Sequence, residues 1–215
     1  NLPNMSAYCE TCASIGNIFF NHRMFSMHGE GKYFDVLEKT LYNGALSGVN
    51  LAGDRFFYPN PLESSGQHER SAWFGCACCP SNVARFIPAI PGYIYSVTDK
   101  DLYVNLFASN NADIIFGKNH VSVVQETNYP WDGDVMITVN PEKEAKFNLR
   151  LRIPGWARNE AIPGGLYTFT ENVEATYVIR VNGEDYNATV TDDYASVLRK
   201  WKKGDKVELL LPMPF

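Results

Sequence analysis

The periodicity of apolar residues changes near residue 92, and this change constrains the fold more than any other feature of the sequence. Over Thr11–His28 and Lys32–Ser47 apolar residues recur every three or four positions, which predicts two helices. Beyond residue 92 short runs rich in β-branched and aromatic residues take over, which predicts strands. We therefore expect an α+β chain with two domains, residues 1–92 and 93–215.

The helical part contains a third, shorter predicted helix, from Pro80 to about Phe86, which Pro88 is expected to end. Residues 56–61 are expected to be extended, because proline restricts the residue before it to extended geometry. The predicted helices are apolar on more than one face, and such helices need neighbours on several sides. We expect those neighbours to precede Asn1.

The second part is expected to be an antiparallel β-sandwich, because many short strands separated by turns are typical of that architecture. The turn sequences include Asp132-Gly133, Asn182-Gly183 and Gly204-Asp205. The predicted strands cover residues 93–97, 102–106, 120–124, 135–139, 147–153, 177–181, 194–198 and 207–211.

Composition excludes several classes of protein. Apolar residues make up 45% of the chain, which is too many for a disordered segment. No window approaches the roughly 20 apolar residues of a membrane span, and no leader sequence is visible at Asn1. A net charge of −5 argues against a nucleic-acid partner. The basic run over residues 199–203 is interpreted as a solvated turn.

All five cysteines lie in the first 79 residues, and the rest of the chain has none. A disulfide-stapled domain would spread an even number of cysteines across the fold. The clustering therefore indicates one local site. The cysteines are Cys9, Cys12, Cys76, Cys78 and Cys79.

Thiolates together with one carboxylate, Glu10, would suit Zn²⁺, which prefers four tetrahedral sulfur, nitrogen and oxygen ligands. Glu10 and Cys12 would point about 200° apart in a helix, so Glu10 must lie at or before the helix start. Cys78 and Cys79 are adjacent, and we expect them to converge on one ion in an irregular loop. Buried free cysteines without a metal, or disulfides, remain the alternatives.

Five short motifs stand out, three in the helical part and two in the part predicted to be a β-sandwich. They are Tyr8–Ser14, Phe57–Glu63, Cys78–Asn82, Arg152–Trp156 and Trp201–Asp205. Together they resemble glycoside hydrolase family 127, whose type members are bacterial β-L-arabinofuranosidases, and the related family 146. The resemblance covers nearly the whole chain.

The resemblance implies a zinc ion held by Glu10, Cys12, Cys78 and Cys79. Cys78 matches the family's nucleophile, and Tyr58 matches a tyrosine that lines the sugar pocket. Cys9 and Cys76 match no ligand, and we expect structural roles for both. The four histidines follow no ligand spacing.

The resemblance also implies that residues 1–92 are the closing helices of an (α/α)₆ barrel and that residues 93–215 form the β-sandwich that follows it. The family's acid/base glutamate and substrate-binding histidines precede the stretch that begins at Tyr8. We therefore do not assign the acid/base role to Glu30 or Glu63, and we expect this chain alone to be inactive. Free thiolates favour a reducing or metal-protected setting, and we expect a bacterial cytoplasm or periplasm.

The implied function is hydrolysis of β-L-arabinofuranosides with retention, releasing L-arabinofuranose by way of a zinc-bound cysteine nucleophile. Zinc would keep the thiol deprotonated, and four anionic ligands would favour a cation-like transition state. The expected partners are an arabinose-containing glycan and a missing N-terminal part of the same protein. The alternative is a non-catalytic carbohydrate-binding or scaffold module with a structural zinc.

Overall fold

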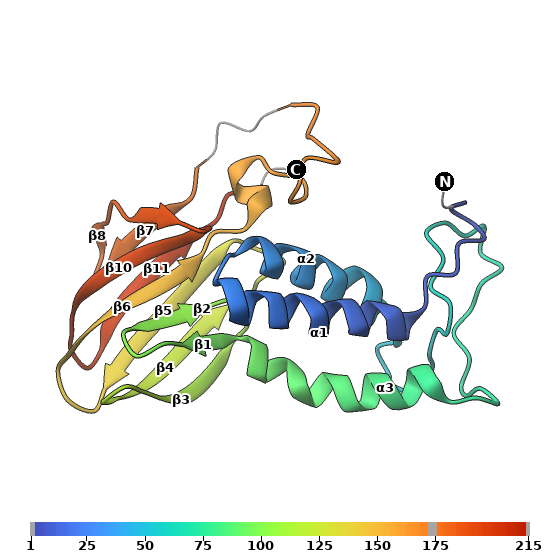
Figure 1. Ribbon diagram of the computed structural model, residues 1–215, viewed down its shortest axis with the longest axis horizontal. Coiled ribbons are helices and arrows are strands. Elements are labelled where there is room, and N and C mark those ends of the chain that lie inside the picture. The colour runs from blue at the N-terminus through green and yellow to red at the C-terminus, as the bar shows by residue number, and fades with distance from the viewer. Residues whose placement is uncertain (1–2, 172–175, 214–215) are drawn as a thin grey trace. The chain divides into compact units, whose positions relative to one another are not determined.

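Helices occupy the first part of the chain and strands the remainder, so the predicted α+β class is confirmed (Figure 1). The computed structural model describes residues 3–171 and 176–213. The chain divides into a helical unit, Asn1–Gly29 with Tyr33–Gly92, and a β unit, Glu30–Lys32 with Tyr93–Phe215. Among the described residues, no helix is both long and apolar enough to cross a membrane.

The first helix, α1, spans Thr11–His28, as the apolar periodicity predicts. Glu10 precedes it in extended conformation, with φ −71° and ψ 135°. Gly29 ends it in the left-handed conformation at φ 72°, and its N–H donates to the Phe25 carbonyl. Glycine adopts that conformation without the steric cost that a Cβ would bring.

The second predicted helix is regular only in its first half. Helix α2 spans Lys32–Thr40, and the chain continues through a π-helical turn, Leu41–Ala45, and a 3₁₀ turn, Leu46–Gly48. The predicted second helix is therefore α-helical over Lys32–Thr40, and its far end, which the sequence predicts to be weakened by glycine, is π- and 3₁₀-helical. Glycine has low helix propensity, and Gly44 and Gly48 both fall in this stretch.

The third helix, α3, spans Cys78–Phe86 and so begins two residues before the predicted start. Proline is tolerated in a first helical turn, where its missing N–H would have no partner, and Pro80 is the third residue. The α-helix ends at Phe86, as predicted, and a 3₁₀ segment follows over Ile87–Tyr93.

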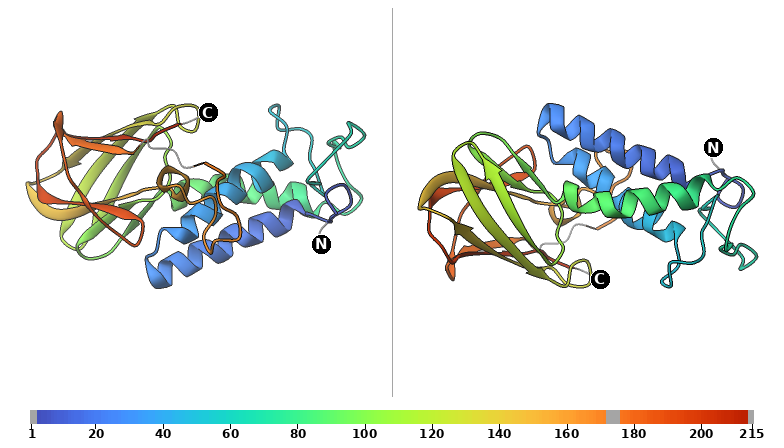
Figure 2. Two further views of the ribbon diagram at one scale, coloured as in Figure 1. Left: turned by 90° about the horizontal axis from the view of Figure 1, so that it is seen from above. Right: turned by 90° about the horizontal axis from the view of Figure 1, so that it is seen from below.

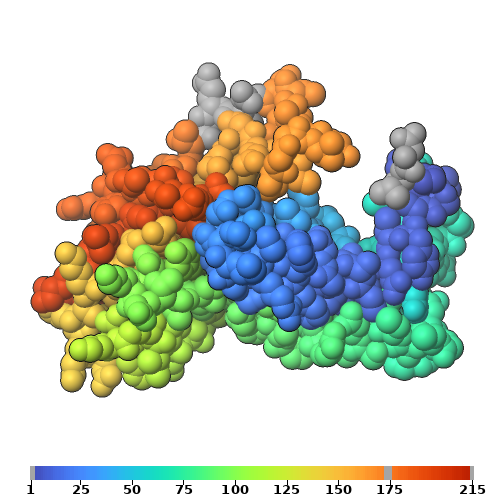
Figure 3. All heavy atoms as spheres, in the orientation of Figure 1, coloured from blue at the N-terminus to red at the C-terminus, as the bar shows by residue number. Residues whose placement is uncertain are grey.

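Helix α1 contacts both of the other helices: Phe25 meets Phe34 of α2, and Phe19 meets Phe86 of α3, each edge to face. All three helices contribute buried apolar residues. Helix α1 is exposed along one face (Figure 3). Its side chains Phe20 and Met27 are 60% and 76% exposed. The buried residues are Ile15, Ile18 and Phe25 of α1, Phe34 and Leu37 of α2, and Val83 and Phe86 of α3.

Two sheets make up the β unit (Figure 2). The five-stranded sheet has the order β1 (Tyr95–Val97), β2 (Asp101–Val104), β6 (Ala145–Arg152), β10 (Tyr194–Trp201) and β9 (Thr189–Thr191). The six-stranded sheet has the order β3 (Asn110–Phe116), β4 (Asn119–Thr127), β5 (Asp134–Pro141), β11 (Asp205–Leu210), β7 (Val178–Val181) and β8 (Glu184–Asp185).

Every predicted strand coincides with or overlaps an observed one, but three observed strands were not predicted. Strand β3 begins with polar residues, and β8 and β9 are two and three residues long and exposed. Expecting antiparallel pairing throughout was also wrong, because β2 pairs with β6 in parallel. Parallel neighbours need a crossover connection, and here β3, β4 and β5 of the other sheet lie between them in sequence.

Buried residues of both sheets form one hydrophobic core. The alternation of apolar and polar residues along the strands places one face of each sheet in this core. The asparagine and glycine of the β7–β8 turn both have positive φ, 54° and 84°, as the predicted two-residue hairpin requires. The largest fully buried side chains include Trp201, Phe147, Phe107, Leu102 and Ile137.

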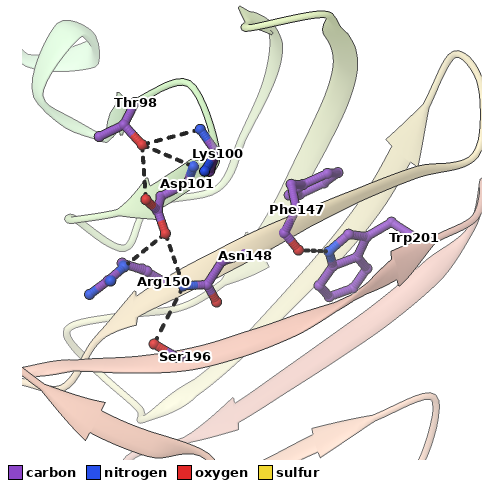
Figure 4. A network of polar contacts seen from close by, with 8 residues as sticks. All are labelled: Thr98, Lys100, Asp101, Phe147, Asn148, Arg150, Ser196 and Trp201. Atoms are coloured by element: carbon purple, nitrogen blue, oxygen red, sulfur yellow. Dashed lines mark hydrogen bonds and ion pairs between the residues drawn. The ribbon is translucent and has the colours of Figure 1, made fainter.

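A polar network ties β2 to its parallel neighbour β6 (Figure 4). The Asp101 carboxylate accepts hydrogen bonds from Thr98 Oγ1 and Asn148 Nδ2, both at 2.9 Å. It also pairs with Arg150 Nε at 3.1 Å. The carboxylate therefore links one strand to two residues of the other.

Candidate metal centre

The candidate metal centre lies in the helical unit, where the N-terminal ends of α1 and α3 meet. Glu10 immediately precedes α1 and Cys12 is the second residue of that helix. Cys78 and Cys79 are the first two residues of α3. One carboxylate oxygen and three sulfurs from these residues all lie within 4.8 Å of one another.

The local backbone explains how each pair converges. Glu10 is extended and lies just before the helix start. This is the position that Glu10 needs if it is to share an ion with Cys12. The expectation that Cys78 and Cys79 lie in an irregular loop is wrong, because both are helical. Adjacent helical residues point about 100° apart, so both sulfurs can face the same side.

Within the cluster, Cys12 Sγ and Cys78 Sγ lie 3.2 Å apart. The Glu10 carboxylate lies 3.9 Å from Cys78 Sγ and 3.6 Å from Cys79 Sγ. Cys79 is buried, whereas Cys78 is exposed. The cluster is therefore anchored in the helical core and open to solvent at Cys78.

Residues 57–60 hold the start of α1 in place. Pro59 pairs with Glu10 in an isolated antiparallel bridge. The Thr11 N–H donates to the Tyr58 carbonyl at 3.0 Å, and the buried Thr11 hydroxyl donates to the Phe57 carbonyl at 3.0 Å. Thr11 is thus a residue of the site that sequence reasoning missed, since a lone threonine in a helix carries no distinguishing pattern.

Two tyrosines lie beside the cluster. A hydrogen bond between the Tyr58 hydroxyl and the Cys78 sulfur raises the pKa of Tyr58 well above its ordinary value, and partial burial adds to the effect. The Tyr58 ring meets Phe74 edge to face, with centroids 5.4 Å apart. Partial desolvation and the neighbouring Glu10 carboxylate raise the pKa of Tyr8.

The pKa values of the clustered thiols indicate whether these side chains suit a cation. The hydrogen bond between the Cys12 and Cys78 sulfurs and partial burial raise the pKa of Cys78, although the Tyr58 hydroxyl acts in the opposite direction. Burial is the main cause of the raised pKa of Cys79. A divalent cation would displace these protons, and sulfur with one carboxylate oxygen is a donor set that suits zinc. The residues therefore fit the metal that the sequence implies.

Cys9 and Cys76 lie outside the group whose ligand atoms converge. Cys9 is half-buried, and its carbonyl accepts the Asn60 N–H at 2.7 Å. Cys76 is exposed. All five cysteines are free, so the disulfide alternative finds no support in the structure.

Comparisons with known proteins place the chain in a family of glycoside hydrolases. Residues 1–92 match the family model described as the β-L-arabinofuranosidase GH127 catalytic domain. Residues 101–213 match the model described as the GH127 middle domain. The chain therefore belongs to glycoside hydrolase family 127.

Similar proteins are considerably longer than this chain. A curated non-reducing end β-L-arabinofuranosidase of Bifidobacterium longum subsp. longum is 36% identical over 99% of this chain and 32% of its own length. A solved GH127 β-arabinofuranosidase is 53% identical, with a TM-score of 0.96 over all of this chain and 34% of that one. A GH127 β-L-arabinofuranosidase from Geobacillus stearothermophilus T6 is 40% identical, with a TM-score of 0.87 over 100% and 33%. The chain thus spans about a third of the length of these relatives.

Proposed function

We propose that the full-length protein hydrolyses β-L-arabinofuranosides with retention and releases L-arabinofuranose, with Cys78 as the nucleophile. The observation that carries this proposal is the convergence of Glu10, Cys12, Cys78 and Cys79 within 4.8 Å in a chain of this family. The substrate class follows from the printed names of the relatives.

The four converging side chains would hold a zinc ion. Zinc bound there would supply positive charge that keeps the thiols deprotonated at neutral pH. Cys78 is suited to the nucleophilic role because it is the exposed cysteine of the cluster, whereas Cys79 is buried. The Tyr58 hydroxyl interacts with the same sulfur, and this supports the proposed role of Tyr58 in lining the sugar pocket.

The reaction has two displacements at the anomeric carbon. Cys78 Sγ forms a bond to this carbon as the bond to the departing oxygen breaks, and a general acid gives that oxygen its proton. Water then attacks the same carbon, the bond to sulfur breaks, and the water proton passes to the conjugate base. We assign neither Glu30 nor Glu63 to the acid/base role, which the family resemblance places before Tyr8.

The same proposal covers the architecture. Residues 1–92 are part of the helical catalytic domain, as closing helices of an (α/α)₆ barrel, and residues 93–215 are a β-sandwich domain. The two sheets with a shared core and the match of residues 101–213 to the middle domain support the second assignment. The substrate partner is an arabinose-containing glycan.

Substitution of the nucleophile tests the proposal against a non-catalytic module with a structural zinc. In the full-length protein, Cys78→Ser is expected to lower kcat by at least about 10³-fold while the fold is kept, since loss of a nucleophile removes most of the acceleration. Cys76→Ser, an exposed cysteine outside the cluster, is the matched control. A catalytic role also predicts a pentosyl adduct on Cys78 by mass spectrometry. Full activity of Cys78→Ser would refute it.

A further inference from the structure

Residues 57–60, which hold the start of α1, are themselves held by two side chains that no motif singles out. The His68 ring stacks on the Phe57 ring, with centroids 4.7 Å apart and planes 16° apart. The Arg70 guanidinium carbon lies 4.4 Å from the centroid of the same ring. Phe57, His68 and Arg70, called here the Phe57 stack, are all half-buried.

His68 and Arg70 are each held by contacts with backbone carbonyl groups. His68 Nε2 lies 2.9 Å from the Pro59 carbonyl oxygen, and it donates to that oxygen when it carries the ring proton. Arg70 donates to the Ser47 carbonyl through Nε at 3.1 Å and through a terminal nitrogen at 2.7 Å. The forked guanidinium makes this double contact, which a lysine could not reproduce.

The contacts lead directly from the Phe57 stack to the candidate metal centre. Pro59, which receives the His68 hydrogen bond, is the bridge partner of Glu10. Tyr58 lies between Phe57 and Pro59 in the sequence, and its carbonyl oxygen is 3.9 Å from Cys79 Sγ. A shift of residues 57–60 would therefore move one carboxylate ligand and alter the surroundings of one thiolate ligand.

We propose that His68 and Arg70 are positioning residues that, through Phe57 and Pro59, fix residues 57–60 and with them the orientation of Glu10 and Tyr58 at the candidate metal centre. This inference rests on the proposed function, because it gives these residues a part in forming that site. Groups that orient metal ligands typically change metal affinity or activity by about 10–100-fold when they are removed.

Zinc affinity of the full-length protein, measured by competition with a chromophoric chelator, tests the proposal independently of activity. His68→Phe keeps an aromatic ring on Phe57 but removes the donor to Pro59, and Arg70→Lys keeps the charge but loses the fork. We expect each to weaken zinc binding by about 10-fold or more. His68→Gln, which restores an N–H donor, is expected to recover part of the affinity.

Two controls separate positioning from general destabilisation. Glu69→Gln changes the exposed residue between the two and is expected to leave zinc affinity unchanged. Leu37→Val is expected to lower the Tm by trimming the buried core of α2 without affecting zinc affinity.

Zinc affinity within twofold of the wild type in both His68→Phe and Arg70→Lys would overturn the proposal. The proposal would also be overturned if Leu37→Val lowered the Tm as much as His68→Phe and Arg70→Lys do and lost as much zinc affinity as they do. If the wild-type protein binds zinc but hydrolyses no arabinofuranoside, the proposed function fails, while weaker zinc binding in the two variants still supports the positioning role. Where activity is present, we expect kcat to fall more than KM rises, because misplaced reacting groups slow the chemical step.

Discussion

Two glycines set how closely the end of the second helical segment approaches α1. A Cβ on Gly48 would lie 2.5 Å from Thr11 Cγ2 and 2.9 Å from its hydroxyl oxygen. A Cβ on Gly44 would lie 2.5 Å from the Ser14 hydroxyl oxygen. Thr11 cannot easily give way, because it is buried and hydrogen-bonded to the Phe57 carbonyl. Close packing at this residue therefore supports the start of α1 and the adjacent ligands.

Gly48→Ala is expected to destabilise the protein by about 1–3 kcal/mol, the usual cost of forcing extra atoms into a packed contact. Gly16→Ala is the matched control, because nothing lies within 4 Å of a Cβ added there in α1. That control is expected to stabilise by about 0.5–1 kcal/mol through helix propensity. Urea unfolding measures both, and equal stability of the two variants would contradict the packing argument.

At the scale of elements, the parallel pairing of β2 with β6 depends on polar side chains as well as on the backbone (Figure 4). Burial alone would raise the pKa of Asp101, but hydrogen bonds from Asn148, Arg150 and Thr98 and the charge of Arg150 outweigh it. The pKa of Asp101 is therefore held below its ordinary range. Strand β2 has only four residues and therefore few backbone hydrogen bonds to β6. The Asp101 carboxylate adds to the stabilisation of this strand pair.

The stability contributed by Asp101 is expected to depend on pH. A carboxyl group with a lowered folded-state pKa contributes stability above its unfolded pKa of about 3.9, and this is lost as the pH falls through the folded value. Asp101→Asn is therefore expected to be less stable than the wild type at pH 6, with a difference that shrinks below about pH 4. Asp99→Asn, at an exposed position in the same turn, is the control. Urea unfolding from pH 6 to pH 3 measures the effect, and a difference independent of pH would contradict it.

At the scale of the whole molecule, the two units differ in what stabilises them. The β unit has one large core to which both sheets contribute. The helical unit has a smaller set of buried apolar residues and places four candidate ligands at its helix ends. A small core gains much from a bound metal, which stabilises the folded state by mass action.

Zinc is accordingly expected to stabilise the helical unit by about 2.7 kcal/mol at a free concentration 100 times its Kd. Hydrogen exchange of the full-length protein, with zinc or with a chelator, should show added protection at residues 10–15, 57–60 and 78–86. Exchange in the β unit should not change. Cys12→Ser should abolish the difference, and a zinc effect that persists in that variant would contradict the ligand assignment.

The sequence predicted much of the fold because local rules decide it. Apolar periodicity located α1, Gly29 located its end, and eight strands followed from short β-rich runs. The parallel β2–β6 pair was not predicted, because pairing between strands distant in sequence is settled by the packing of two sheets. Strand β3 was missed because its polar first residues carry no alternating pattern.

The sequence by itself determined which residues can bind a soft divalent metal, since cysteine and glutamate side chains carry that chemistry wherever they lie. It also determined that Glu10 and Cys12 could share an ion only if Glu10 lay at or before the helix start, because helix geometry separates residues two positions apart. Only the tertiary structure decided that Cys78 and Cys79 begin a helix and that Thr11, His68 and Arg70 support the site. Such contacts join residues far apart in the chain, and their distances depend on how the helices and extended segments pack.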